Sequence, residues 1–136
     1  MEKILSALDD TNNDKLLTTT TAKIRALTLK LLRELPLSPE IVAQYAEKLA
    51  DYKFVDEIND VKAGTFLRWI SLDGDNLYLH AGGIIREVKV TKNGLMMVCK
   101  NFGGRHYQIK MDNCLIFQKL TTQEKILLSA LDHLAK

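Results

Sequence analysis

The distribution of glycine and proline constrains the fold of this chain more than any other feature. All seven glycines lie between Gly64 and Gly104, whereas the only two prolines are Pro36 and Pro39. Glycine is common where a chain turns sharply, so the middle of the chain needs many turns and its flanks need few. This division predicts helices at both ends and short strands between them.

The N-terminal flank carries the apolar spacing of amphipathic helices. Between residues 14 and 35, leucine and isoleucine recur every three or four positions, which gives one buried stripe. Pro36 ends this helix, and Ser38 with Pro39 caps and starts a second helix, whose pattern fades after Tyr52 into an acidic connector. We expect the two helices to form a hairpin. The second helix is too acidic for a recognition helix, which argues against a helix-turn-helix DNA reader.

The C-terminal flank predicts a third helix. Thr121 and Glu124 have the spacing of a capping box. The residues expected on the apolar side are Ile126, Leu127, Ala130, Leu131 and Leu134. A similar sequence occurs at residues 2–9, so the two segments either arose by chance or present similar faces to the sheet or to a symmetric dimer.

The glycine-rich middle alternates apolar and polar residues with the period of a strand. The expected strands are 65–72, 84–91, 95–100, 106–111 and 115–119. Asn93-Gly94 is a strong hairpin signal between the second and third of them. Five short strands in about 55 residues predict a small antiparallel barrel.

These elements define the expected architecture. The class is α+β, with an N-terminal helical region over residues 1–60, a five-stranded small β-barrel over 61–120, and a C-terminal helix over 121–136. The last helix should pack on the barrel or on a dimer partner, because its apolar side is costly to leave in water.

Four short runs carry a resemblance to known families. They are Lys-Ala-Gly-Thr-Phe-Leu-Arg-Trp (62–69), Gly-Gly-Ile-Ile-Arg-Glu-Val (82–88), Tyr-Gln-Ile-Lys (107–110) and Leu-Ile-Phe (115–117). In strand order and turn placement, residues 61–120 resemble Tudor-like and related Src-homology-type small barrels. The aromatic cage of methyl-reading Tudor domains does not match position by position, so no such role is implied. The combination of Arg-Trp-Ile (68–70), Gly-Gly-Ile (82–84) and Ile-Phe-Gln-Lys-Leu-Thr-Thr-Gln-Glu-Lys (116–125) also resembles small uncharacterised proteins of large DNA viruses of protists. That resemblance implies a viral intracellular setting, which includes the virion, and no activity.

Charge is distributed unevenly along the chain. Residues 1–61 hold eight Lys and Arg against eleven Asp and Glu, so 8 − 11 = −3, whereas residues 62–136 hold eleven against six, so 11 − 6 = +5. The basic C-terminal part favours an anionic partner or an acidic protein surface. We expect an intracellular protein, cytoplasmic or nuclear, with no membrane partner, because no apolar run reaches the length needed to cross a bilayer.

The sequence offers little for catalysis. It has no phosphate-cradling glycine loop and no paired-ligand zinc spacing, so we expect a protein that is not an enzyme and has no cofactor or metal. His80, Cys99, His106 and Cys114 are the imidazole and thiol groups of the middle region. Whether the fold brings them together is left open by the sequence, and Cys99 is more simply a buried structural thiol.

Aromatic and basic residues alternate along residues 100–110. The candidate binding residues are Arg68, Trp69, Lys100, Phe102, Arg105, His106, Tyr107 and Lys110. Rings stack on nucleobases and cations contact phosphates, so this pattern predicts a non-enzymatic module that binds DNA or RNA. A simpler interpretation places Tyr107 and Trp69 in the core. The alternative function is a structural or adaptor protein that binds other proteins or itself as a homo-oligomer.

Overall fold

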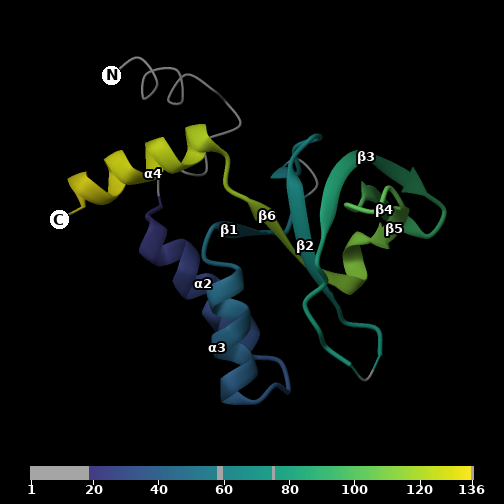
Figure 1. Cartoon of the computed structure of the whole chain (residues 1–136), viewed down its shortest axis with the longest axis horizontal. Helices are drawn as coiled ribbons and strands as arrows, with labels where there is room; N and C mark the ends of the chain where they lie inside the picture. The colour runs from purple at the N-terminus through teal and green to yellow at the C-terminus, as the bar shows by residue number, and fades with distance from the viewer. Residues whose placement is uncertain (1–18, 58–59, 75, 136) are drawn as a thin grey trace.

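The computed structural model describes residues 19–57, 60–74 and 76–135, and it confirms the expected α+β class (Figure 1). The helices are α2 (Thr21–Arg33), α3 (Pro39–Lys48) and α4 (Thr122–Leu134), with a short 3-10 helix, η3 (Met111–Asn113). The strands are β1 (Tyr52–Val55), β2 (Phe66–Ser71), β3 (Gly83–Thr91), β4 (Gly94–Lys100), β5 (His106–Lys110) and β6 (Cys114–Lys119).

The helix boundaries follow from local capping. The side chain of Thr20 accepts a hydrogen bond from the backbone of Lys23 at the start of α2, and that of Ser38 accepts one from Ile41 at the start of α3. The hydroxyl of Thr20 therefore begins the first helix. The apolar stripe extends back to residue 14, but the sequence leaves the start of the helix open, because the threonines at 18–21 are β-branched and poor helix formers. Residues 14–18 lie outside the described part of the chain. The two helices pack against each other as expected.

The described strands form one antiparallel sheet of six strands, so the expected number of five is wrong. Their order is β1-β6-β2-β3-β4-β5. The strand that the sequence did not predict is β1, which we had placed at the end of the second helix and in the acidic connector. It pairs with β6, from Tyr52 opposite Lys119 to Val55 opposite Ile116.

The sheet is open, so the expectation of a closed barrel is also not met. In the described sheet, β1 and β5 are the two edges. A five-stranded barrel would need β5 to close onto a free edge of β6. Here β6 lies between β1 and β2, so both of its edges are occupied. The pairing of β1 with β6 therefore explains both differences from the expected barrel: the sheet has a sixth strand, and it does not close.

The sheet curls and has two faces, which we call inner and outer. The inner face encloses one core, made of Val55, Leu67, Trp69, Ile85, Met97, Cys99, Ile109, Met111 and Ile116. On the outer face, α2 and α3 cover β1, β6 and β2 through a second core, made of Leu32, Val42, Leu49, Tyr52, Ile70, Leu79 and Phe117. Successive residues of a strand alternate between these faces.

The outer face of β3, β4 and β5 has no helix on it in the described structure. In Figure 1 these strands lie on the side of the molecule away from α2, α3 and α4. Ile84 on β3 is 43% exposed there, and the neighbouring Lys100 and His106 are exposed. Half of the outer face is therefore open to a ligand.

The C-terminal helix is anchored at both ends. Its predicted capping box is present, with Thr121 and Glu124 exchanging hydrogen bonds. At the other end, the Asp132 carboxylate accepts hydrogen bonds from the backbone amide and hydroxyl of Thr21, at 2.9 and 2.6 Å. Its core residues are Leu127 and Leu128, which pack with Leu120, Ile24 and Leu131. Leu134, expected on the apolar side, is instead 78% exposed.

The N-terminal segment and the possibility of a membrane span complete the comparison with the expected architecture. The segment 2–9, which resembles the start of α4, lies outside the described residues. Among the described helices, none has both the length and the apolar character to span a lipid bilayer.

Candidate nucleic-acid interface

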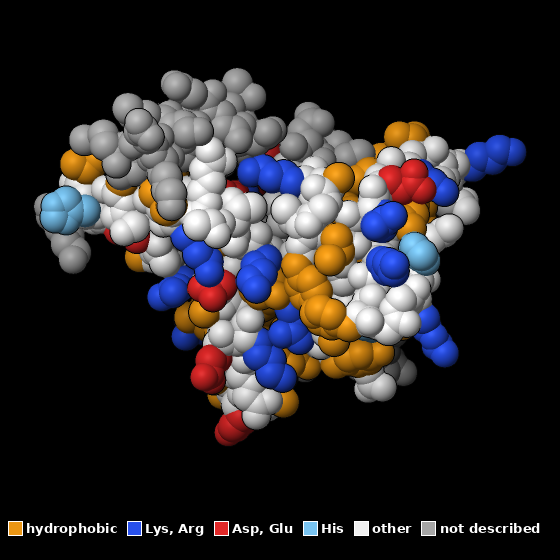
Figure 2. All heavy atoms as spheres, turned by 45° about the horizontal axis from the view of Figure 1, so that its top comes forward, with side chains coloured by type: hydrophobic (Ala, Val, Ile, Leu, Met, Phe, Trp, Pro, Cys, Tyr) orange, Lys and Arg blue, Asp and Glu red, His pale blue; other side chains and the backbone are white. Residues whose placement is uncertain are grey.

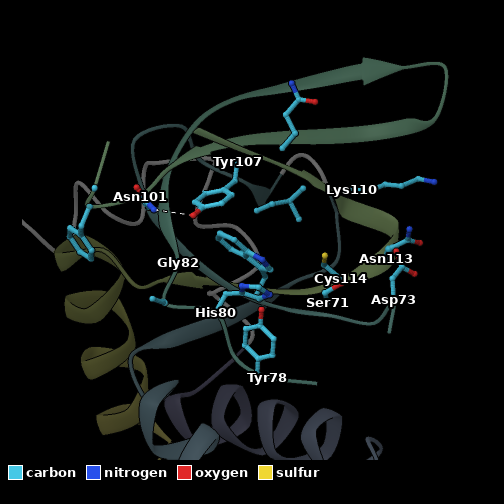
Figure 3. A pocket seen from close by; sticks show the side chains of 16 residues that line it. Ser71, Asp73, Tyr78, His80, Gly82, Asn101, Tyr107, Lys110, Asn113 and Cys114 are labelled. Atoms are coloured by element: carbon cyan, nitrogen blue, oxygen red, sulfur yellow. Dashed lines mark hydrogen bonds between the residues drawn. The ribbon is translucent and has the colours of Figure 1, made fainter. Parts of the chain in front are cut away.

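A pocket of about 610 Å³ opens at the rim of the inner face, beside the free edge strand β5 (Figure 3). Trp69 on β2 and Ile109 on β5 form its base, since both belong to the inner core. Tyr107 faces the same side as Ile109, two residues away on the same strand. The pocket exists because β5 has no further strand beside it in the described sheet.

Three aromatic rings form a continuous stack along one wall of this pocket. The imidazole of His80 lies 5.3 Å from the indole of Trp69, with an angle of 21° between the ring planes. The phenol of Tyr78 lies 4.5 Å from the same imidazole and is tilted by 41° to it. Burial lowers the pKa of His80, so its ring stays neutral at physiological pH. A flat, neutral, apolar surface of this kind suits stacking with another flat ring.

The fourth ring of the pocket is held in place by the loop between β4 and β5. The side-chain amide of Asn101 donates a hydrogen bond to the hydroxyl of Tyr107 at 3.2 Å. Its carbonyl oxygen accepts one from the backbone amide of Arg105 at 2.9 Å. Gly104 in the same loop has a φ of 82°, which favours glycine. Asn101 thus fixes both the loop and the phenol that faces the pocket.

Polar groups line the opposite end of the pocket. They come from Ser71, Asp73, Asn113, Cys114 and Lys110. Burial, and to a lesser degree the carboxylate of Asp73, raises the pKa of the Cys114 thiol to about 11. The thiol is therefore protonated at neutral pH and is a weak nucleophile. This end offers hydrogen-bond donors and acceptors next to an aromatic wall, as in sites that bind a flat polar ligand.

The fold distributes the eight predicted binding residues over the two faces of the sheet and the loop between β4 and β5, where Arg105 is exposed. Trp69, Phe102, Tyr107 and Lys110 line the pocket. Lys100 on β4 is the register partner of His106 on β5, and Met96 on β4 is that of Lys110 on β5. The backbone positions of Lys100, His106 and Lys110 are on the outer face of the sheet. Tyr107 and Lys110 belong to the same edge strand, β5. The residues that line the pocket and the residues on the outer face are therefore separated only by this strand.

Arg68 lies apart from the other predicted residues. It alternates with Trp69 on β2, so its side chain is on the helix-covered outer face, where its charge acts on Tyr52. Its Nε donates a hydrogen bond to the backbone carbonyl of His80 at 2.9 Å. Glu87 on β3 forms an ion pair with Lys89 at 3.3 Å. Arg68 holds the segment that carries His80.

Sequence reasoning missed several residues of the pocket. Tyr78, His80 and Asn101 precede or follow turns, where no periodic pattern marks a side chain as facing a site. The positions of Tyr78 and His80 depend on the pairing of residue 79 with residue 70, which is a contact between segments, and Asn101 is held by its hydrogen bonds within the β4–β5 loop. One signal was available, since the alternation of Tyr78 and His80 about a buried Leu79 places both rings on one side.

The four imidazole and thiol groups of the middle region do not form one site. Cys99 is fully buried in the inner core, and burial raises the pKa of its thiol to about 11. His106 is exposed on the outer face of β5, whereas His80 and Cys114 line the pocket. Within residues 19–57, 60–74 and 76–135, no group of three His, Cys, Asp or Glu is arranged to hold a metal ion.

Comparison with known proteins finds one relative. An uncharacterised protein of Acanthamoeba polyphaga mimivirus is 30% identical to this chain over 91 residues, which cover 66% of the chain and 56% of the relative. The chain thus spans little more than half the length of the protein it matches. This similarity supports the resemblance to proteins of large DNA viruses of protists. No family model and no solved structure matches the chain, so the resemblance to Tudor-like barrels has no such support.

Proposed function

We propose that this chain is a non-enzymatic module that binds single-stranded nucleic acid and takes an unpaired base into the aromatic pocket. The observation that carries the proposal is the stack of Trp69, His80 and Tyr78 beside Tyr107 in one open pocket. Stacking of a base on an aromatic side chain contributes about 1–3 kcal/mol and requires no particular base. The pocket volume of about 610 Å³ is in the range typical of small-molecule sites, so a base with its sugar can enter.

The charge around the pocket favours an anionic ligand. From Gly83 to Lys110 the chain holds six Lys and Arg and one Glu, so 6 − 1 = +5. Figure 2 shows Lys and Arg side chains spread over the part of the molecule that contains these strands. A positive surface next to a stacking site is the usual combination in proteins that bind single strands.

The test is a titration of the full chain with labelled single-stranded DNA, single-stranded RNA and duplex DNA at about 50 and 200 mM salt. Trp69 is the only tryptophan, so its fluorescence reports whether a base enters the pocket. We expect Tyr107→Leu and Tyr78→Leu each to weaken single-strand binding by about 5- to 150-fold, as the loss of one stacked base predicts.

Tyr45→Phe is the matched control, because Tyr45 is a tyrosine of α3 whose hydroxyl bonds to the backbone of Leu77 outside the pocket. This variant should bind as the parent does. Absence of binding to every single strand at low salt would overturn the proposal. Tight binding to duplex DNA that does not change the fluorescence of Trp69 would also contradict it.

A second candidate function is a structural or adaptor protein, and the open sheet favours it. In the described sheet, β1 and β5 each have a neighbouring strand on one side only, so a partner strand could add to either edge. Val90, near the tip of the β3–β4 hairpin, is 82% exposed. Together with the viral relative, this is compatible with a homodimer or a virion component inside an infected cell. Sedimentation across micromolar concentrations tests self-association, and a strict monomer would exclude it.

A further inference from the structure

The outer face of β3, β4 and β5 adjoins the pocket and shares its edge strand. The register places Ile84, Lys100 and His106 in one row across these three strands, and Phe66 on β2 continues the row. Residues paired in this way lie on the same face of a sheet, about 5 Å from their neighbours. The row thus runs from Phe66, which packs at the border of the helix-covered core, to Ile84, Lys100 and His106 on the uncovered part of the outer face.

Phe102 connects the pocket to this row. Its ring lies 5.3 Å from the ring of Phe66, which belongs to the outer face, and the same residue lines the pocket. The side chain is nevertheless 87% exposed. A large apolar ring held at the boundary of two surfaces and left in water offers a further platform for stacking.

Cations lie along the path that leads away from this ring. Lys100 is at the end of β4 nearest to Phe102, and Lys110 is at the opposite end of β5. Lys110 lies four positions beyond His106 on β5, which is about 13 Å at 3.3 Å per residue. The two lysines therefore reach different phosphates of one strand. Lys89 on the same face forms an ion pair with Glu87 at 3.3 Å, so its charge is less available to a phosphate than that of Lys100.

We infer that a bound single strand leaves the pocket past Phe102 and runs over the outer face of β3–β5, with its phosphates on Lys100 and Lys110. This inference rests on the proposed function, because it extends the strand whose base occupies the pocket. The occupant is an anionic polymer with exposed rings, and both the charge and the aromatic groups of this face match that chemistry.

The test compares thymidine monophosphate with oligothymidylates of 4 and 12 nucleotides, using the fluorescence of Trp69 and the dependence of affinity on salt. The mononucleotide should quench Trp69, and the 12-mer should bind more tightly than the mononucleotide. Lys100→Gln and Lys110→Gln should each lower the slope of log affinity against log salt for the 12-mer by about 0.7, the value expected for one phosphate contact of a single strand.

Matched controls are Lys23→Gln and Lys48→Gln, exposed lysines on α2 and α3 that should leave the slope unchanged. Phe102→Ser should weaken the 12-mer more than the mononucleotide, because the ring borders the pocket and also contacts Phe66 on the outer face. If the 12-mer quenches Trp69 but both lysine variants keep the parent slope, the path is wrong and the proposed function stands. If neither ligand quenches Trp69, the proposed function itself fails. Equal affinity for the mononucleotide and the 12-mer would show that only the pocket binds.

Discussion

The carboxylate of Glu124 is completely buried and forms an ion pair with the ammonium group of Lys53, which joins the first turn of α4 to the edge strand β1. Lys62 lies 3.6 Å from the same carboxylate. Burial alone would raise the pKa of Glu124, but hydrogen bonds from Lys53 and from the backbone of Thr121, together with the two positive charges, outweigh it and lower the pKa. One carboxylate thus fixes the helix to the sheet.

Glu124→Gln should destabilise the protein, since it removes the negative charge and leaves two lysines facing each other. Removal of one partner of a buried pair costs about 3–5 kcal/mol. The lysine side chains keep 15% and 22% of their surface exposed, so we expect the lower end, about 3 kcal/mol, in urea unfolding at pH 7. Lys125→Gln breaks an exposed pair with Asp51 and should cost less than about 0.5 kcal/mol. Equal losses would refute the anchoring role.

The same carboxylate predicts how stability depends on pH. The folded pKa of Glu124 is below its ordinary value of 4.5, so the folded state binds this proton less readily than the unfolded state. The contribution of ionised Glu124 to the free energy of unfolding is complete above pH 4.5 and is lost as the pH falls through the pKa of Glu124 in the folded protein. The parent should lose stability in this acidic window more steeply than Glu124→Gln, as measured by thermal melts between pH 7 and 3. Parallel curves would contradict this prediction.

The apolar face of α4 predicts a contrast between two leucines of one helix. Leu127 is 1% exposed and Leu134 is 78% exposed. Leu127→Ala should cost about 2–5 kcal/mol, whereas Leu134→Ala should change stability by less than about 0.5 kcal/mol. Deletion of residues 122–136 should therefore lower the melting temperature strongly or make the protein insoluble. A truncated protein that melts within a few degrees of the parent would show that the helix is dispensable.

The stacked pair of His80 and Trp69 gives the protein an internal pH reporter. Burial lowers the pKa of His80, so the imidazole should gain its proton below pH 6.5, and a protonated ring quenches a neighbouring indole. The contribution of His80 to the free energy of unfolding is complete above pH 6.5. It falls as the pH drops toward the pKa of His80 in the folded protein, because the unfolded chain takes up this proton first. His80→Gln should abolish the fluorescence transition. His106→Gln, on the outer face, should retain it, and a transition lost in both variants would exclude the stack as its source.

Cys114 allows occupancy of the pocket to be measured chemically. With a pKa of about 11, roughly one thiol in a thousand is ionised at pH 8, so alkylation should be slow in the native protein and fast in urea. A bound single strand should slow the native reaction further, because the residue lines the pocket. The variant Cys99→Ala reports this site alone. Unchanged alkylation at saturating ligand would place the ligand elsewhere.

Local signals in the sequence predicted local structure well. The turn after Thr91 and the capping box at Thr121 depend on neighbours in the chain, and both are present as expected. Gly94 has a φ of 107°, which explains why glycine was a reliable signal there. Strand β1 has only four residues, and its place is set by pairing with β6, more than 60 residues away. No periodic pattern of that length distinguishes a strand from the end of a helix.

The candidate site shows the same limit. Aromatic and basic residues between 100 and 110 were predicted together, but alternation along β5 sends Tyr107 to the pocket and His106 to the outer face. The stack of Trp69 with His80 depends on a contact between β2 and the segment before β3. Such contacts are made by the whole fold, and residue types along the chain do not specify them.

The position of β6 between β1 and β2 also bears on how the protein is made. A ribosome releases β1 and β2 well before residues 114–119, so the nascent chain has no partner for β1, and β2 lacks one of its two neighbours, until the last strand emerges. During that interval the helical hairpin can form locally, but its apolar face has no completed sheet beneath it. The final strand enters between two segments that are already present, so a chain stalled before residue 119 should be a target for chaperones.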